Sequence, residues 1–154
     1  MKFDGQLKVP APREAVFDRL KDAPYFASCV EGVRDLVEVN PTHYTAVFET
    51  KIAYIKFKFQ VSVELTEAER PVAIAAKIEG KPHGIVGRLS ATSSARFEEA
   101  GSETIIHYAI EANLTGRLGS IGQPVLKSKA KEMERQFVAN LRNGFADTQK
   151  AQAS

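Results

Sequence analysis

An alternation of apolar and polar residues between Ile55 and Leu65 constrains the fold of this chain more than any other feature. A β-strand points successive side chains to opposite faces, so an apolar residue at every second position marks one buried face. The pattern predicts a long strand in a sheet with one apolar and one solvated face. The apolar positions are Ile55, Phe57, Phe59, Val61, Val63 and Leu65.

Weaker strand patterns lie on both sides of this segment. They fall at about residues 2–9, 33–39, 44–52, 72–80, 87–99 and 103–114. Strands joined by short turns pair antiparallel, so the sequence predicts one antiparallel sheet. Between the first two strands, the stretches 11–22 and 24–32 predict two short helices, with Pro12 in a first turn and Gly32 at a helix end.

The C-terminal part of the chain has a helical period. Apolar residues at spacings of 4, 3, 4 and 4 form one face of a helix of about 25 residues, which would cover the apolar face of the sheet. The fold class is therefore α+β, with a single domain over residues 1–145 and a polar, disordered tail over 146–154. The helix face consists of Leu126, Ala130, Met133, Phe137 and Leu141.

Composition excludes several classes of protein. The net charge of +2, from 21 basic and 19 acidic residues, gives no reason to expect a nucleic-acid partner. One cysteine cannot form an internal disulfide, and no apolar run reaches the roughly 18 residues of a membrane span. We therefore expect a cytoplasmic protein.

Residue sizes raise the possibility of an internal pocket. The strand at 87–99 presents the small residues Ala91, Ser93 and Ala95 on its more apolar face, opposite the long helix. Because protein interiors hold few voids, small residues there indicate either a pocket or a helix that packs closer. The residue pattern alone leaves these two alternatives open.

Catalytic chemistry finds little support in the sequence. A nucleophilic cysteine needs a nearby base, and Cys29 has no histidine close to it in sequence. The three histidines, His43, His83 and His107, have no metal-binding spacing, and phosphate-binding glycine motifs are absent. We expect no metal and no cofactor. Tyr108 and His83 are the two candidates for a polar group inside a pocket.

Four stretches together resemble one family. "PAPREAVFDRL", "SCVEGV", "IAYIKFKFQVSVEL" and "GRLGSIGQPVLKSKAKEMERQF" are similar to the CoxG family of carbon monoxide dehydrogenase subunits, in the START-like (SRPBCC) superfamily. The resemblance implies a helix-grip fold, as in the birch pollen allergens. In this fold a curved antiparallel sheet wraps around the long C-terminal helix and encloses an apolar cavity. It also implies that Cys29 is a small buried residue at the edge of the cavity.

The resemblance implies a non-catalytic binding protein for a hydrophobic small molecule, a quinone or another lipid-like ligand. The alternative is an assembly or membrane-recruitment factor that acts through its surface on a molybdenum-containing dehydrogenase. That factor would use the basic run Lys127, Lys129, Lys131 and Arg135, for which a solvated helix face is the plainer interpretation. In either case we expect a protein that is not an enzyme and that could lie against the inner face of the membrane. An enzymatic role, as in some START-like relatives, would need a polar residue inside, for which Tyr108 and His83 are the candidates.

Twelve residues are predicted to contact the ligand, each with an ordinary core position as the alternative. They comprise two aromatic residues of the long strand, four residues of the last two strands, three residues in or next to the glycine-rich entrance Gly116–Gly122, and three of the helix. The residues are Phe57, Phe59, Ala91, Ser93, Tyr108, Ile110, Leu118, Ile121, Val125, Met133, Phe137 and Leu141.

Overall fold

One seven-stranded antiparallel sheet forms the body of the molecule in a computed structural model. The structure describes residues 1–153, with side chains through Phe145. The strands are ordered β1-β7-β6-β5-β4-β3-β2 across the sheet. Their bounds are β1 (Lys2–Val9), β2 (Val33–Asn40), β3 (His43–Ile52), β4 (Ile55–Glu69), β5 (Ala73–Pro82), β6 (Gly87–Ala100) and β7 (Glu103–Gly116).

The chain order explains this topology. From β2 to β7 each strand pairs with the next through a short connection, and β1 joins the free side of β7. The long alternating segment forms β4, and its register with β3 and β5 puts the predicted apolar positions on one face. The prediction is wrong for Ile55, which stands at the first position of β4 beside the turn and is 57% exposed. The predicted antiparallel sheet is confirmed.

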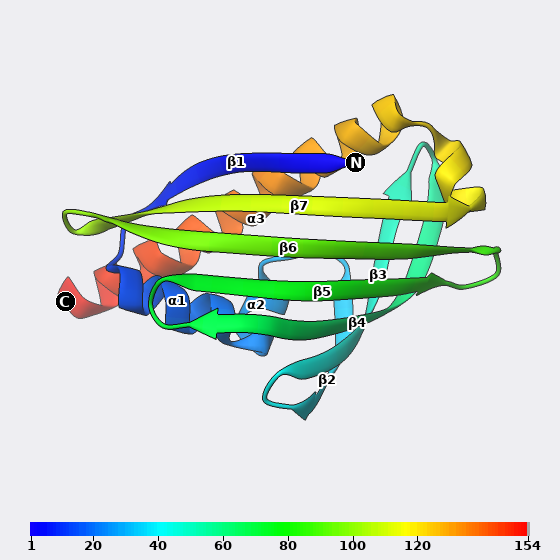
Figure 1. The fold of residues 1–154 in the computed structure, drawn as a ribbon. Helices are drawn as coiled ribbons and strands as arrows, with labels where there is room; N and C mark the ends of the chain where they lie inside the picture. Colours follow the sequence, from blue (N-terminus) through cyan, green and yellow to red (C-terminus); the bar gives the residue numbers. More distant parts are fainter. Residues whose placement is uncertain (154) are drawn as a thin grey trace.

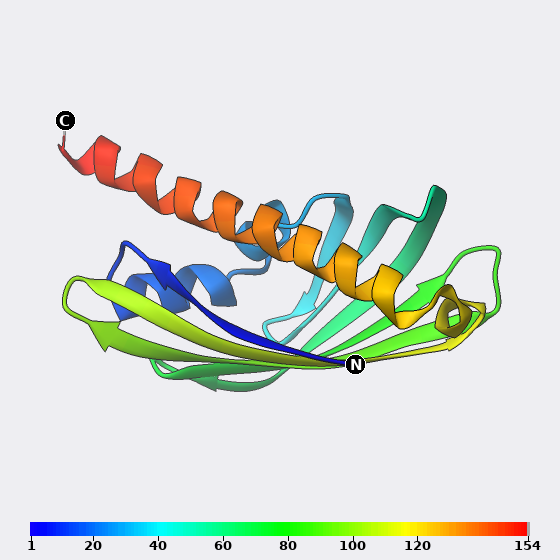
Figure 2. The same ribbon diagram turned by 90° about the horizontal axis from the view of Figure 1, so that it is seen from above.

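Four helical segments complete the fold. They are α1 (Arg13–Lys21), α2 (Ala23–Ser28), the 3-10 helix η1 (Arg117–Ile121) and α3 (Gln123–Ala153). The long helix α3 runs across the concave face of the sheet, and α1 and α2 lie at the end of the sheet where α3 finishes (Figures 1 and 2). This arrangement confirms the helix-grip architecture. The predicted disordered tail, 146–154, lies outside the residues whose side chains the structure describes, and it stays a prediction.

The apolar interior is divided into two separate clusters. The first, here the α1-side core, joins α1 and α2 to the sheet and to the C-terminal half of α3. The second, the η1-side core, joins η1 to the β3–β4 end of the sheet. The α1-side core contains Val9, Ala11, Val16, Phe17, Cys29, Phe97, Ile106, Leu141 and Phe145. The η1-side core contains Ile52, Phe57, Phe59 and Leu118.

Polar contacts fasten α3 at the α1-side core. The guanidinium of Arg19 lies 4.7 Å from the ring centroid of Phe145 and 5.0 Å from that of Tyr25. The amide of Asn140 donates a hydrogen bond to the backbone carbonyl of Cys29 over 3.0 Å. These contacts and the buried Leu141 hold one end of the helix firmly in place.

Candidate ligand-binding site

Between the two cores, the inner face of the sheet carries side chains that remain only half-buried. Two rows of residues cross the sheet here, and no member of either row is buried. We call these rows, together with the helix residues above them, the midsection. The first row is Val63, Ile78, Ala91 and Ala112, and the second is Leu65, Ala76, Ser93, Ile110 and Phe3.

The midsection is long enough to hold an extended molecule. Along β6, Leu89, whose partner Leu114 packs on the η1-side core, lies eight positions before Phe97 in the α1-side core. At about 3.3 Å per residue this stretch of strand spans about 26 Å. Small residues, Ala91 and Ser93, stand in the middle of it.

The face of α3 above the midsection is also half-buried. Of the five residues on the predicted apolar face, only Leu141 is fully buried, and Leu126, Ala130, Met133 and Phe137 retain partial exposure. Phe137 packs at the border of the α1-side core, where its ring lies 5.3 Å from the ring of Phe26. The helix therefore covers the midsection without filling it.

The twelve predicted ligand residues divide into two groups in the structure. Four of them, Phe57, Phe59, Leu118 and Leu141, are buried in the two cores and can only form end walls. The others retain partial exposure, and Val125 at the start of α3 is 37% exposed. Those facing the midsection from the sheet or helix are Ala91, Ser93, Tyr108, Ile110, Met133 and Phe137. Ile121 packs against the η1-side core.

The glycine-rich stretch before α3 is held at its start by backbone contacts, and the predicted entrance stays a prediction. Residues 117–121 form η1, Leu118 has no exposed surface, and the backbone N–H of Arg117 donates to the carbonyl of Val86. Gly116 has φ of 64°, and a Cβ atom there would come within 2.5 Å of the Val86 carbonyl oxygen. Glycine is thus required for a close backbone contact at this position.

A polar pair borders the midsection beside β1. The ring of Tyr108 lies across Gly5, where a Cβ atom would come within 2.7 Å of the tyrosine hydroxyl. Burial raises the pKa of Tyr108 to about 12, and hydrogen bonding to Glu134 of α3 adds to this shift. An adjacent groove of about 350 Å³ runs between β1 and α3. It is lined by Gln6, Leu7, Glu134, Arg135, Val138, Ala139 and Arg142. This side is the polar rim of the site.

Tyr44 is an interior polar residue missing from the predicted site. It lies on the inner face of β3, beside Val63 of the first midsection row and two residues from the buried Ala46. Burial raises the pKa of Tyr44 to about 12, and its hydroxyl has no hydrogen-bond partner among the described residues. In the sequence Tyr44 alternates with Ala46 and Phe48, which indicates the inner face of the strand, but no sequence signal shows that its hydroxyl lacks a partner.

The other candidate polar residues do not converge. His43 bonds Ser62 over 2.8 Å and His107 bonds Glu98 over 2.6 Å, both on the outer face of the sheet, and His83 is exposed in the β5–β6 loop. Cys29 is 3% exposed, and burial raises the pKa of its thiol, which makes it a poor nucleophile. Among the described residues, no group of three potential metal ligands occurs.

Within the described residues, no helix combines the length and the hydropathy that a membrane crossing requires.

Structural comparison first defines the class. A conserved protein from Geobacillus kaustophilus superposes with a TM-score of 0.88 at 21% identity, covering 96% of this chain and 97% of that one. A START superfamily protein from Mycobacterium smegmatis gives 0.73 at 10% identity, covering 96% and 98%. Ara h 8.0201 gives 0.67 at 11% identity, with the same coverage. The chain has a START-like helix-grip fold.

Sequence comparison then gives the family. The profile of the CoxG family of carbon monoxide dehydrogenase subunits matches residues 5–145, and the chain belongs to that family. The match runs from Gly5 in the middle of β1 to Phe145 in α3 and covers every element between them. A search of curated proteins finds no match.

Proposed function

We propose that this protein binds a hydrophobic small molecule in the midsection and performs no chemistry on it. The observation that carries the proposal is the separation of the interior into two cores, with half-buried apolar residues on both sheet and helix between them. Protein interiors are normally close-packed, so apolar surface facing an element that does not fill it favours a ligand.

The shape of the midsection supports an elongated, mostly apolar ligand. Its rows are formed by aliphatic and small residues, and its polar groups, Tyr44, Ser93 and Tyr108, are few and spread apart. A quinone or another lipid-like molecule meets these conditions, because it joins a long apolar body to a small polar head. The family's name supports a carbon monoxide dehydrogenase as the protein partner.

The test is to identify the ligand directly. Protein purified without detergent is extracted with organic solvent, and the extract is analysed by mass spectrometry. The empty protein is then titrated with quinones of different tail length and with fatty acids while its thermal unfolding midpoint is followed. We expect one class of these ligands to raise the unfolding midpoint. At a free ligand concentration a hundredfold above Kd, the free energy of unfolding should increase by about 2.7 kcal/mol.

Two controls make the result specific. Met133→Gln places a polar group in the half-buried helix face and should weaken binding, whereas Glu132→Gln, on an exposed neighbouring position, should not. A wild-type protein that yields no extractable molecule and shows no midpoint shift with any of these ligands would reject the proposed function.

A further inference from the structure

The charges of this protein are separated along its length. Residues 50–58, 80–90 and 112–131 together contain nine of the 21 basic residues and none of the 19 acidic ones. This part of the chain has a charge of +9, against −7 for the remainder, although the whole chain has only +2. The basic residues are Lys51, Lys56, Lys58, Lys81, Arg88, Arg117, Lys127, Lys129 and Lys131.

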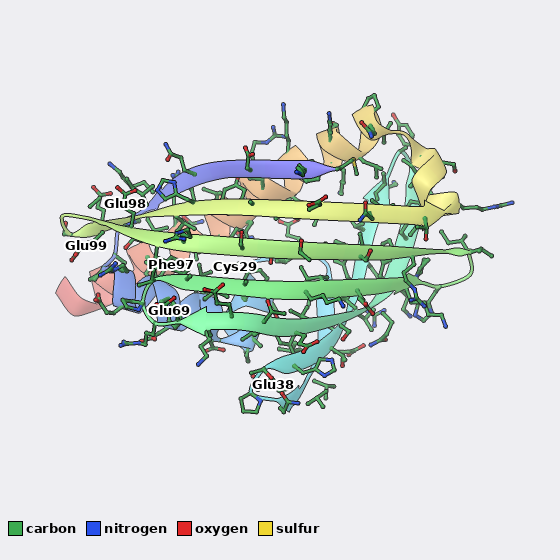
Figure 3. All side chains as sticks on the ribbon, in the orientation of Figure 1. Cys29, Glu38, Glu69, Phe97, Glu98 and Glu99 are labelled. Carbon is green, nitrogen blue, oxygen red and sulfur yellow. The ribbon has the colours of Figure 1, made fainter. Side chains whose placement is uncertain are left out.

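The three basic segments meet at one end of the molecule. They contain the β3–β4 turn, the β5–β6 loop, and η1 with the start of α3, which gather at the same end in both views (Figures 1 and 2). The carbonyl of Val86 accepts from the backbone of Arg117, and the carbonyl of Lys58 accepts from that of His83. At the opposite end, Glu69, Glu98 and Glu99 project from the sheet (Figure 3).

This basic end also carries exposed apolar side chains. Among the described residues, six large apolar side chains are strongly exposed, and four of them lie here. Tyr54 is 94% exposed, Val86 79%, Ile55 57% and Val125 37%. They come from the β3–β4 turn with the first residue of β4, from the β5–β6 loop and from the first turn of α3, so they project from three separate parts of the chain rather than forming one strip.

The turn that presents Tyr54 has an unfavourable backbone. Ala53 and Tyr54 both have positive φ, at 50° and 70°, in a two-residue connection between β3 and β4. Asparagine and glycine suit these angles, whereas a bulky residue rarely adopts them. The fold thus holds an aromatic side chain outward where a small polar residue would fit more easily.

We propose that this end, the basic tip, docks on the surface of an anionic lipid bilayer. Tyrosine and aliphatic side chains partition into the interfacial layer, and lysine and arginine beside them meet anionic headgroups. Two of the nine basic side chains have an acidic partner: Glu49, which also pairs with Arg34, lies 3.9 Å from Lys56, and Glu132 lies 3.5 Å from Lys129. The other seven form no ion pair among the described residues, so the basic tip keeps most of its positive charge. An acidic protein surface would use the charges but would not require apolar side chains from three parts of the chain.

A single-tryptophan variant tests this docking. The chain contains no tryptophan, so Tyr54→Trp introduces one reporter at the basic tip. We expect a blue shift of its emission and quenching by shallow brominated lipids with vesicles of phosphatidylcholine and phosphatidylglycerol at 3:1. We expect neither effect with phosphatidylcholine alone, and loss of binding at high salt. Val39→Trp, at an exposed site of β2, is the matched control and should not respond.

Charge variants in the Tyr54→Trp background distinguish a local surface from overall charge. Lys51→Gln, Arg117→Gln and Lys127→Gln should each lower the vesicle partition coefficient about fivefold. Lys2→Gln, Lys21→Gln and Lys77→Gln change net charge equally from exposed positions elsewhere and should have little effect. Equal losses in both sets, or equal binding to both vesicle types, would overturn the proposal.

No vesicle binding at low salt would also overturn it, and would leave an acidic protein as the partner of the basic tip. None of these measurements depends on the midsection. A ligand found in the midsection without vesicle binding would retain the proposed function and remove only this inference.

Discussion

The side chain of Cys29 is packed as part of a core, and its environment determines its reactivity. Cys29 is the C-cap residue of α2 and belongs to the α1-side core. Its backbone carbonyl accepts a hydrogen bond from the side-chain amide of Asn140. Burial raises the pKa of the thiol, so little thiolate exists at neutral pH. Nothing beside it acts as a base, because the three histidines lie on the outer face or in a loop.

We therefore predict that Cys29→Ala retains ligand binding and loses about 1 kcal/mol of stability. In the native wild-type protein, a thiol reagent should modify Cys29 far more slowly than in urea. Stability is measured by denaturant unfolding and binding by the midpoint shift with ligand. A folded Cys29→Ala protein without binding would contradict this prediction.

Tyr44 should make the stability of the fold depend on pH in the alkaline range. Its folded-state pKa is about 12 against an ordinary value of 10.0, so folding favours the neutral phenol. The unfolded chain then binds fewer protons above pH 10, and stability should fall as pH rises from about 10 to about 12. Tyr44→Phe should remove part of this fall, and Tyr108 should account for another part in the same direction.

The measurement is the urea midpoint of wild type and variant at pH 8 and pH 11. Tyr54→Phe serves as the control, because Tyr54 is 94% exposed and its substitution should leave the slope unchanged. If the urea midpoint of Tyr44→Phe falls between pH 8 and pH 11 by as much as that of the wild type, Tyr44 is not held in an apolar environment. Tyr44→Phe should also weaken a ligand with a polar head, because it removes the unpartnered interior hydroxyl.

At the scale of an element, the two halves of α3 contribute differently to the stability of the fold. Its C-terminal part is packed through Leu141, whereas Phe137 and Met133 remain half-buried. We predict that Leu141→Ala costs about 2–5 kcal/mol, the usual penalty for a cavity in a packed core. Phe137→Ala should cost less than the about 3–5 kcal/mol of a buried phenylalanine, and should shift preference toward a bulkier ligand. Urea unfolding and a ligand panel measure both effects.

A full-core cost for Phe137→Ala, together with no ligand preference, would mean that α3 is packed along its whole length. The comparison with Leu141→Ala on the same helix face controls for general effects of truncation, since the two positions are four residues apart.

The connection η1 could be predicted from the sequence only in part. Three glycines between Gly116 and Gly122 predicted a mobile entrance, because composition reports backbone freedom. The structure adds tertiary constraints that composition cannot contain: the Val86 carbonyl bound to Arg117, and Leu118 fully buried. By contrast, the period-two and helical patterns predicted sheet, helix and their apolar faces correctly, since periodicity depends on local geometry alone.

Amide exchange separates the anchored part of this connection from any mobile part. The Arg117 amide, bonded to Val86, should be protected to a degree comparable with strand amides. Amides from Gly119 to Gly122 should exchange faster and slow when ligand is bound. Uniform protection across the whole connection without ligand would reject a mobile entrance.

At the scale of the whole molecule, two packed cores lie at the ends of the sheet, and the loosely packed midsection lies between them. The α1-side core and the η1-side core each bury their side chains, while the residues that separate them stay half-buried beneath α3. The basic tip lies at the η1 end, and Glu69, Glu98 and Glu99 project at the opposite end, with the midsection between them (Figure 3). A fold that needed only stability would gain from filling the midsection.

Filling the midsection is therefore the most direct test of the molecule as a whole. Ala91→Leu and Ser93→Leu add aliphatic volume where the structure leaves room, and each should retain or raise the urea midpoint while lowering ligand affinity severalfold. Ala46→Leu, at a position only 6% exposed on the same face, is the matched control and should cost about 1–3 kcal/mol through overpacking. Should Ala91→Leu destabilise as much as Ala46→Leu, the middle is already packed, and the protein acts through its surface alone.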